Sequence, residues 1–155
     1  ERPNLLIILK STRIGIWLIC RDTVMRKPPR RTAALADFAS LPAKGRVLIL
    51  SDMLELGHLA ESAHAELKTA IQQARPDHLL LIGPLMASLA GALTGDGHDT
   101  AINTETYQTA EQAYARTREL AGQAELMLVK GSNGSGAHLI AADLRRLAGK
   151  CPSSR

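Results

Sequence analysis

The chain has 155 residues, of which 45% are hydrophobic and 3% aromatic, and its formal net charge is +4. This length fits one domain with a core of its own, and the scarcity of aromatic residues favours helices packed on a sheet over an all-β sandwich. Its two cysteines, Cys20 and Cys151, form neither a disulfide framework nor a metal-binding spacing, and no apolar run spans a membrane, so we expect a cytoplasmic protein.

The first 31 residues hold most of the positive charge, with eight basic and two acidic side chains. The remaining residues carry 11 basic and 13 acidic side chains, a net charge of −2. A basic block can bind nucleic acid, but no recognition-helix pattern accompanies this one, and we predict no nucleic-acid partner. Within the segment, residues 5–9 and 14–19 are predicted to be β segments joined by a turn. Because the chain begins with Glu1 rather than Met, we expect a piece of a longer protein.

From residue 32 onward, the apolar periods of helices and strands alternate. The predicted helices cover residues 32–39, 59–74, 85–93, 109–121 and 137–147, and the predicted strands cover 46–50, 78–82, 99–103 and 126–129. Most of these strands are apolar on both faces, which is typical of a parallel sheet covered on both sides. We therefore predict an α/β domain over residues 32–150, with a doubly wound, mostly parallel, Rossmann-like sheet and helices on both faces. Residues 151–155 form a tail.

Two polar loops directly follow buried strands. They are the run Ser-Asp-Met-Leu-Glu-Leu-Gly at 51–57 and the run Lys-Gly-Ser at 130–132. In an open α/β sheet, ligands bind at the carboxyl ends of the strands. Asp52 and Glu55 could pair with an ammonium group, whereas Lys130 and Ser132 suit a carboxylate or a phosphate. The alternative is structural: Asp52 and Ser132 cap helices, and Lys130 is an exposed strand-end charge.

The sequence contains no phosphate-binding loop of the form Gly-x-x-x-x-Gly-Lys-Ser/Thr. The run Gly-Ser-Asn-Gly-Ser-Gly at 131–136 precedes a predicted helix, and its amides could hold an anion. Its spacing fits neither the phosphate loop nor Gly-x-Gly-x-x-Gly. The motifs predict no metal site and no catalytic residue.

Residues 45–57, 79–84 and 128–132, taken in this order, resemble the carboxyl-terminal domain of the Mur ligases, the ATP-dependent, amide-forming enzymes of peptidoglycan precursor synthesis. The resemblance covers residues 32–147 and is strongest to the members that add D-alanyl-D-alanine to UDP-N-acetylmuramoyl-tripeptide. It implies that this chain positions substrate and nucleotide beside a central ATPase domain of the parent enzyme. That central domain carries the phosphate loop and uses ATP and Mg²⁺. The chain alone is expected to bind neither and to be inactive.

The chain also departs from the family pattern. The family usually has Gly where this chain has Ser51, and an acidic residue where it has His138. Upstream, the family carries the loop Asp-Asp-x-Tyr-Asn-Ala-Asn-Pro, which approaches the nucleotide. Residues 21–28 here are Arg-Asp-Thr-Val-Met-Arg-Lys-Pro, and they keep only Asp22 and Pro28 in register. The resemblance therefore implies a nucleotide-binding role for Asp22.

Two hypotheses remain open from the sequence. The first is the ligase domain just described, and the second is a stand-alone Rossmann-like module that binds a nucleotide or a protein without catalysis. The DNA upstream of Glu1 discriminates between them, because a Gly-Lys-Thr phosphate loop and a UDP-sugar domain encoded there favour the first.

The contrast between clear similarity after residue 32 and altered, Arg-rich sequence before it leads us to expect a reading-frame disturbance in the gene or its record. Resequencing the locus should reveal a shifted frame ahead of residue 32. An intact open frame that encodes residues 1–31 as printed would contradict this expectation.

Overall fold

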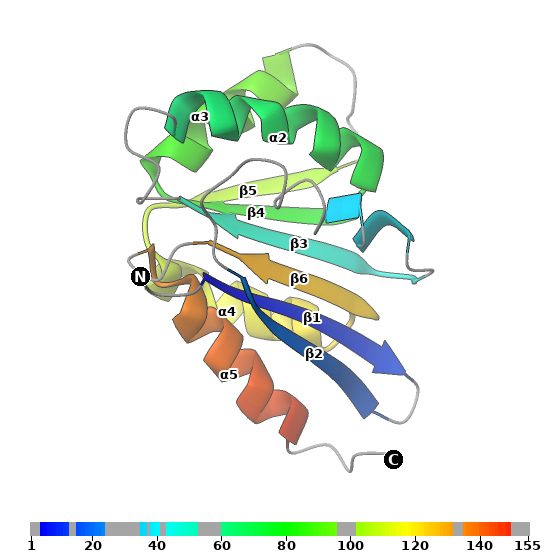
Figure 1. Cartoon of the computed structure of the whole chain (residues 1–155). Helices are drawn as coiled ribbons and strands as arrows, with labels where there is room; N and C mark the ends of the chain where they lie inside the picture. The colour runs from blue at the N-terminus through cyan, green and yellow to red at the C-terminus, as the bar shows by residue number, and fades with distance from the viewer. Residues whose placement is uncertain are drawn as a thin grey trace.

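The computed structural model describes residues 4–12, 15–23, 35–36, 38–40, 43–52, 60–95, 102–131 and 135–149. One twisted sheet lies between two layers of helices (Figure 1). The elements in chain order are β1 (Asn4–Thr12), β2 (Gly15–Thr23), β3 (Arg46–Ser51), α2 (Ala60–Ala74), β4 (His78–Ile82), α3 (Pro84–Gly95), β5 (Asn103–Tyr107), α4 (Ala110–Ala121), β6 (Leu126–Lys130) and α5 (Ala137–Gly149).

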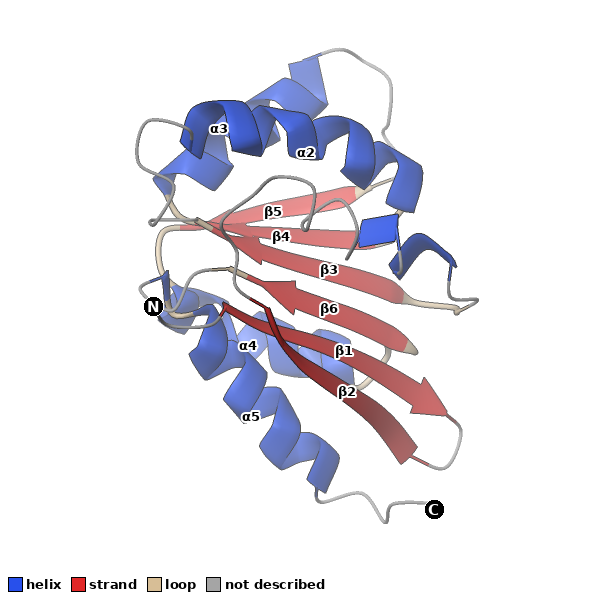
Figure 2. Ribbon diagram, in the orientation of Figure 1, coloured by secondary structure: helices blue, strands red, loops and turns tan. Residues whose placement is uncertain are grey.

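The described strands form a single six-stranded sheet in the order β2-β1-β6-β3-β4-β5 (Figure 2). Strands β6, β3, β4 and β5 run parallel to one another. Strand β1 pairs antiparallel with both β6 and β2. The predicted doubly wound, mostly parallel α/β fold is confirmed, and the two β segments predicted near the amino end extend this sheet beyond β6.

Side chains of the central strands alternate between two hydrophobic cores, as the period of a strand requires. The core on the α2 and α3 side contains leucines at alternate strand positions, namely Leu48, Leu50, Leu79, Leu81, Leu126 and Leu128. The core on the α4 and α5 side contains the residues between them, namely Val47, Ile49, Leu80, Ile82, Met127 and Val129. Because both faces of β3, β4 and β6 are apolar, helices must cover both sides of the sheet.

The helices lie close to their predicted positions, and within the described residues no helix is long and apolar enough to span a bilayer. The strand predicted over 99–103 is placed wrongly, because β5 spans Asn103–Tyr107 and residues 99–101 lie outside the described part. β5 is an edge strand in which Asn103 and Thr106 are exposed and the other residues are half-buried. Such a polar strand lacks the apolar run by which the inner strands were predicted.

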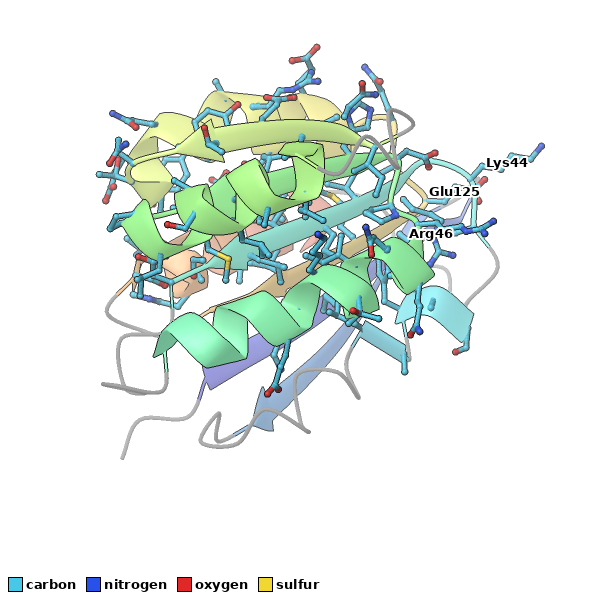
Figure 3. The ribbon with its side chains drawn as sticks, turned by 90° about the horizontal axis from the view of Figure 1, so that it is seen from above. Lys44, Arg46 and Glu125 are labelled. Atoms are coloured by element: carbon cyan, nitrogen blue, oxygen red, sulfur yellow. The ribbon has the colours of Figure 1, made fainter. Side chains whose placement is uncertain are left out.

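Arg46, at the start of β3, binds the end of α2 and Phe38, which lies in the short helical stretch described at 38–40. Its guanidinium carbon lies 4.5 Å from the centre of the Phe38 ring. Its Nη2 donates to the Phe38 carbonyl at 2.7 Å and to the Ala74 carbonyl, at the end of α2, at 3.2 Å. At the same edge of the molecule, Lys44 N donates to Glu125 Oε2 at 2.6 Å (Figure 3). At Ala74, the Arg46 cation lies at the carboxyl end of α2 and complements the dipole of that helix.

A buried carboxylate joins α4 to α5. Asp143 is 5% exposed, and Arg118 donates to its two oxygens through Nε at 2.7 Å and Nη2 at 2.8 Å. Arg146 donates to Asp143 Oδ1 at 2.7 Å. The hydrogen bonds from Arg118, and then those from Arg146, hold the pKa of Asp143 below its usual 3.8, although burial alone would raise it.

We predict that Asp143 contributes to acid sensitivity. Because its pKa is lowered by folding, its stabilising effect is complete above the unfolded-state pKa of about 3.9 and is lost as the pH falls through the lower folded-state value. Asp143→Asn should therefore lose less unfolding free energy than the native chain between about pH 5 and pH 2. Urea unfolding at a series of pH values across this range measures the effect. A variant whose unfolding free energy falls with pH as steeply as that of the native chain would contradict the prediction.

Candidate functional site

Strands β3 and β6 are hydrogen-bonded neighbours whose following helices lie on opposite faces of the sheet. β3 leads to α2 on one face, and β6 leads to α5 on the other (Figure 1). This arrangement is a topological switch point, where the two connections diverge and leave a crevice beyond the carboxyl ends of the strands. The two polar loops identified in the sequence begin at this point, at Ser51 and at Lys130.

Asp52, which follows β3, caps helix α3 from outside that helix. Its Oδ1 accepts from the Met86 amide at 2.9 Å and its Oδ2 from the Leu85 amide at 3.2 Å, and the residue is 3% exposed. These amides lie in the first turn of α3, which contains no acidic residue of its own. The capping alternative is thus observed for Asp52, and the negative charge also complements the helix dipole.

Gly83 makes this capping arrangement possible. Its φ is +106°, and a Cβ atom there would lie 2.4 Å from Asp52 Cγ. Any other residue at this position would be strained and would also displace the carboxylate. The Gly83-Pro84 pair therefore ends β4, starts α3 and leaves space for Asp52.

Lys130 is the last residue of β6 and pairs with Leu50 of β3. It is 2% exposed, so the expectation of an exposed strand-end charge is wrong. The inner strands are covered on both faces, and this cover extends to the final residue of β6. A buried ammonium group must be compensated by polar partners, which makes Lys130 part of the packed crevice rather than of the solvated surface.

A close contact joins the end of β3 to the start of α5. Ser51 is 1% exposed, and its Oγ lies 2.5 Å from Ser135 Oγ. A Cβ atom on Gly131 would lie only 1.5 Å from Ser51 Oγ and 3.0 Å from the Ala137 Cβ. The Ser51 side chain thus occupies the space that Gly131 leaves, directly after the end of β6.

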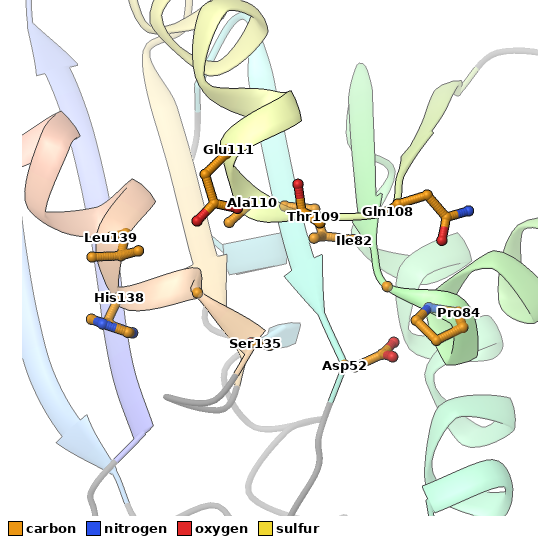
Figure 4. A pocket seen from close by; sticks show the side chains of 12 residues that line it. Asp52, Ile82, Pro84, Gln108, Thr109, Ala110, Glu111, Ser135, His138 and Leu139 are labelled. Atoms are coloured by element: carbon orange, nitrogen blue, oxygen red, sulfur yellow. The ribbon is translucent and has the colours of Figure 1, made fainter.

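A cavity of about 400 Å³ opens beside this contact, at the carboxyl ends of β3, β4 and β5 (Figure 4). Its wall includes the first residues of α4 and α5. The polar groups that border it are Asp52, Gln108, Thr109, Glu111, Ser135 and His138. The volume and the position of this cavity are typical of a small-molecule site in an open α/β sheet.

The amino ends of α4 and α5 converge on this cavity. Gly136 has φ +80°, and a Cβ atom there would lie 2.8 Å from the Ala110 Cβ, so the two helix starts are nearly in contact. Thr109, the N-cap residue of α4, makes no side-chain capping hydrogen bond. Helix amino ends carry partial positive charge, whereas Asp52 and Glu111 supply negative charge around the same cavity. The cavity therefore suits a ligand that bears both charges.

His138 lies near the start of α5 and borders the cavity. Its Nδ1 is buried and has no hydrogen-bond partner among the described residues. No group of three or more His, Cys, Asp or Glu side chains in the described part of the chain could hold a metal ion.

The structure brings Asp52 and Lys130 to neighbouring strand ends. Glu55 and Ser132 lie outside the described residues. The backbone of Asp22 is part of β2, but its side chain is not described. Because Ile7 pairs with both Cys20 and Val129, Asp22 is level with Gly131, two strands away at the same sheet edge. The ligand roles of these residues remain predictions.

Ser51, Ser135, Thr109 and Glu111 were not among the residues singled out as site candidates in the sequence. One sequence feature could have pointed to Ser51, because it replaces the glycine that the family usually has. Ser135 lay within the glycine-rich run before α5, but nothing in that run distinguished it from its neighbours. Thr109 and Glu111 precede and begin an ordinary amphipathic helix, and only the fold places them beside the cavity.

The family model described as "Mur ligase, glutamate ligase domain" matches residues 15–133. The UDP-N-acetylmuramoyl-tripeptide–D-alanyl-D-alanine ligase of Bacillus subtilis (strain 168) is 32% identical over 138 residues, which cover 88% of this chain and 29% of that protein. The enzyme of the same name from Rickettsia prowazekii (strain Madrid E) is 27% identical over 129 residues, covering 83% of this chain and 26% of that protein. The chain thus spans less than a third of these relatives.

Solved structures show the same fold. A crystal structure of MurF from Acinetobacter baumannii aligns with a TM-score of 0.65 at 18% identity, covering 89% of this chain and 29% of that chain. A second crystal structure of MurF from that organism aligns with a TM-score of 0.62 at 20% identity, covering 89% and 30%.

We predict that Gly131→Ala destabilises the chain by about 1–3 kcal/mol, because the new methyl group would overlap Ser51. Ser51→Gly removes both overlapping atoms, so the double variant Gly131→Ala/Ser51→Gly should be more stable than Gly131→Ala alone. Urea unfolding of the two single variants and the double variant measures the coupling. Additive free-energy changes would show that the two residues are not in the close contact described.

Proposed function

Because the chain belongs to the Mur ligase family, we propose that it is the substrate-positioning, carboxyl-terminal domain of a cytoplasmic ligase that joins D-alanyl-D-alanine to UDP-N-acetylmuramoyl-tripeptide. The observation that carries this proposal is the cavity at the carboxyl edge of the sheet, whose wall includes Asp52 after β3 and Ser135 and Gly136 before α5. The family match to residues 15–133 and the two ligases of that name support it.

The charges around the cavity fit the amine substrate of such a reaction. A dipeptide carries an ammonium group and a carboxylate. Asp52 and Glu111 suit the ammonium, and the amino ends of α4 and α5 suit the carboxylate. Holding the dipeptide in one orientation brings its amine toward the partner carboxyl group, and orientation of this kind contributes several kcal/mol to a bimolecular reaction.

ATP would supply the energy by activating the tripeptide carboxyl group, and Mg²⁺ would accompany its phosphates. This chain has no Gly-x-x-x-x-Gly-Lys loop, so the proposal assigns the phosphates and the metal to a central ATPase domain. Lys130, Ser132 and Asp22 would face that domain from the carboxyl edge of the sheet. Residues of this chain would orient substrate and nucleotide and would exclude water when the two domains close.

A chimera tests the proposal. The matching segment of the Bacillus subtilis ligase is replaced by this chain, and amide formation from UDP-N-acetylmuramoyl-tripeptide and D-alanyl-D-alanine is measured with ATP. We expect ligation by the chimera and none by the 155-residue chain alone. A folded chimera that binds substrate without ligating, or ATP-dependent ligation by the isolated chain, would contradict the proposal.

Within the chimera, Lys130→Met should reduce ligation by about 30-fold or more, because a lost charge-assisted contact costs on the order of 2–5 kcal/mol. Methionine keeps most of the buried stem and removes the ammonium group. Lys44→Ala is the matched control, because Lys44 is exposed at the opposite edge of the sheet, and its ligation should equal that of the unmodified chimera. If the Lys130→Met chimera ligated as fast as the unmodified chimera, Lys130 would have a structural role only.

A further inference from the structure

We propose that Glu111 and Leu139 bind the amino-terminal residue of the dipeptide: Glu111 pairs with its ammonium group, and Leu139 packs against its methyl group. This inference rests on the proposed function, which supplies a dipeptide with an amine. It also distinguishes the two acids that border the cavity, because it assigns the ammonium group to Glu111 and leaves Asp52 with the role of a helix cap.

Asp52 is already engaged within its own chain. Its two carboxylate oxygens accept hydrogen bonds from the Leu85 and Met86 amides, and the residue is 3% exposed. The backbone of Gly83 lies so close that a Cβ atom there would be 2.4 Å from the Asp52 Cγ. A ligand that approached this carboxylate would compete with the cap of α3 and would find little of the carboxylate accessible.

Glu111 is the contrasting acid. It lies in the first turn of α4, borders the cavity and is exposed. Among the described residues, no hydrogen bond or ion pair involves its carboxylate. In Figure 4, its side chain extends from α4 toward the start of α5, whereas Asp52 lies at the end of β3 near Pro84. The Glu111 carboxylate can therefore pair with an ammonium group without disrupting a contact of the fold.

Leu139 provides an apolar surface on the same side of the cavity. It is 41% exposed and borders the cavity from the first turn of α5. Its amide donates to the Gly136 carbonyl at 3.0 Å, and a Cβ atom on Gly136 would lie 2.8 Å from the Cβ of Ala110, the neighbour of Glu111 in the chain. The two first turns that carry Glu111 and Leu139 are thus nearly in contact.

The chemistry of an amino-terminal D-alanine matches this pair. Its ammonium group and its methyl group are attached to the same carbon atom, so a site for this residue needs an acid and an apolar surface close together. Covering the exposed Leu139 side chain with a methyl group removes apolar surface from water. The ion pair and the apolar contact together would hold the amine in one orientation.

The test measures binding to the full 155-residue chain by amide chemical shifts, which also detect weak binding. The probes are D-alanyl-D-alanine, D-lactyl-D-alanine, in which a hydroxyl group replaces the ammonium, and glycyl-D-alanine, which lacks the first methyl group. The variants are Glu111→Gln, Leu139→Ala and Asp52→Asn. Glu66→Gln is the matched control, because Glu66 is an exposed acid on α2 and does not border the cavity.

We expect Glu111→Gln to weaken D-alanyl-D-alanine binding about 3- to 10-fold, the loss of an ion pair that is partly exposed to water, and to leave D-lactyl-D-alanine binding unchanged. Leu139→Ala should weaken D-alanyl-D-alanine binding about 3- to 5-fold, the effect of burying one methyl group, and should leave glycyl-D-alanine binding unchanged. Asp52→Asn should unfold at a lower temperature and keep the native preference for the amine over the hydroxyl probe. Glu66→Gln should bind all three probes as the native chain does.

Several outcomes would overturn the inference. If Glu111→Gln weakened the amine and hydroxyl probes equally, its carboxylate would serve only the dipole of α4. Unchanged binding of D-alanyl-D-alanine by Glu111→Gln or by Leu139→Ala would remove that residue from the site. Loss of the preference for the amine in Asp52→Asn alone would assign the ammonium group to Asp52, and Glu111→Gln decides the question even where Asp52→Asn does not fold. Binding of no probe by the native chain would also refute the inference, whereas ligation by the chimera tests the proposed function independently.

Discussion

Strands β3 and β6 lie side by side, and their connections must leave the sheet on opposite faces. This requirement separates α2 from α5 and opens the crevice at the carboxyl edge. Where the two strands end, the Ser51 side chain packs closely against Gly131. Together with the core contacts of α5 and the Asp143–Arg118 pair, this close approach helps to place α5 and with it one wall of the cavity.

The opposite wall of the cavity is held by a helix-capping interaction. Asp52 leaves β3 and gives both carboxylate oxygens to amides in the first turn of α3, which is possible because Gly83 lacks a side chain. One residue thereby links the ends of two parallel strands to a helix start. These hydrogen bonds tie the start of α3 to the end of β3 beside the cavity.

Much of the fold could be predicted from the apolar runs at 47–50, 79–82 and 126–129, because strands buried on both faces leave a continuous signal in the sequence. β5 could not be placed, since its alternation depends on polar side chains such as Glu105, which pairs with Arg116 and Tyr107 instead of entering a core. The burial of Lys130 and the pairing of Ser51 with Ser135 were also beyond prediction. Both depend on how far the helix layers reach over the strand ends, which is a tertiary property.

The order of the strands in the sheet differs from their order along the chain, and this has a consequence for how the protein forms. β1 pairs with β6, so the first strand and the last described strand are direct neighbours. Contacts between segments so distant in sequence form slowly, because a long loop must close before they can be made. During synthesis, which proceeds at about 5–20 residues per second, the hairpin of β1 and β2 has no partner in the sheet until β6 has left the ribosome. For those seconds its free edge is available to chaperones, to proteases and to the edges of other unfinished chains.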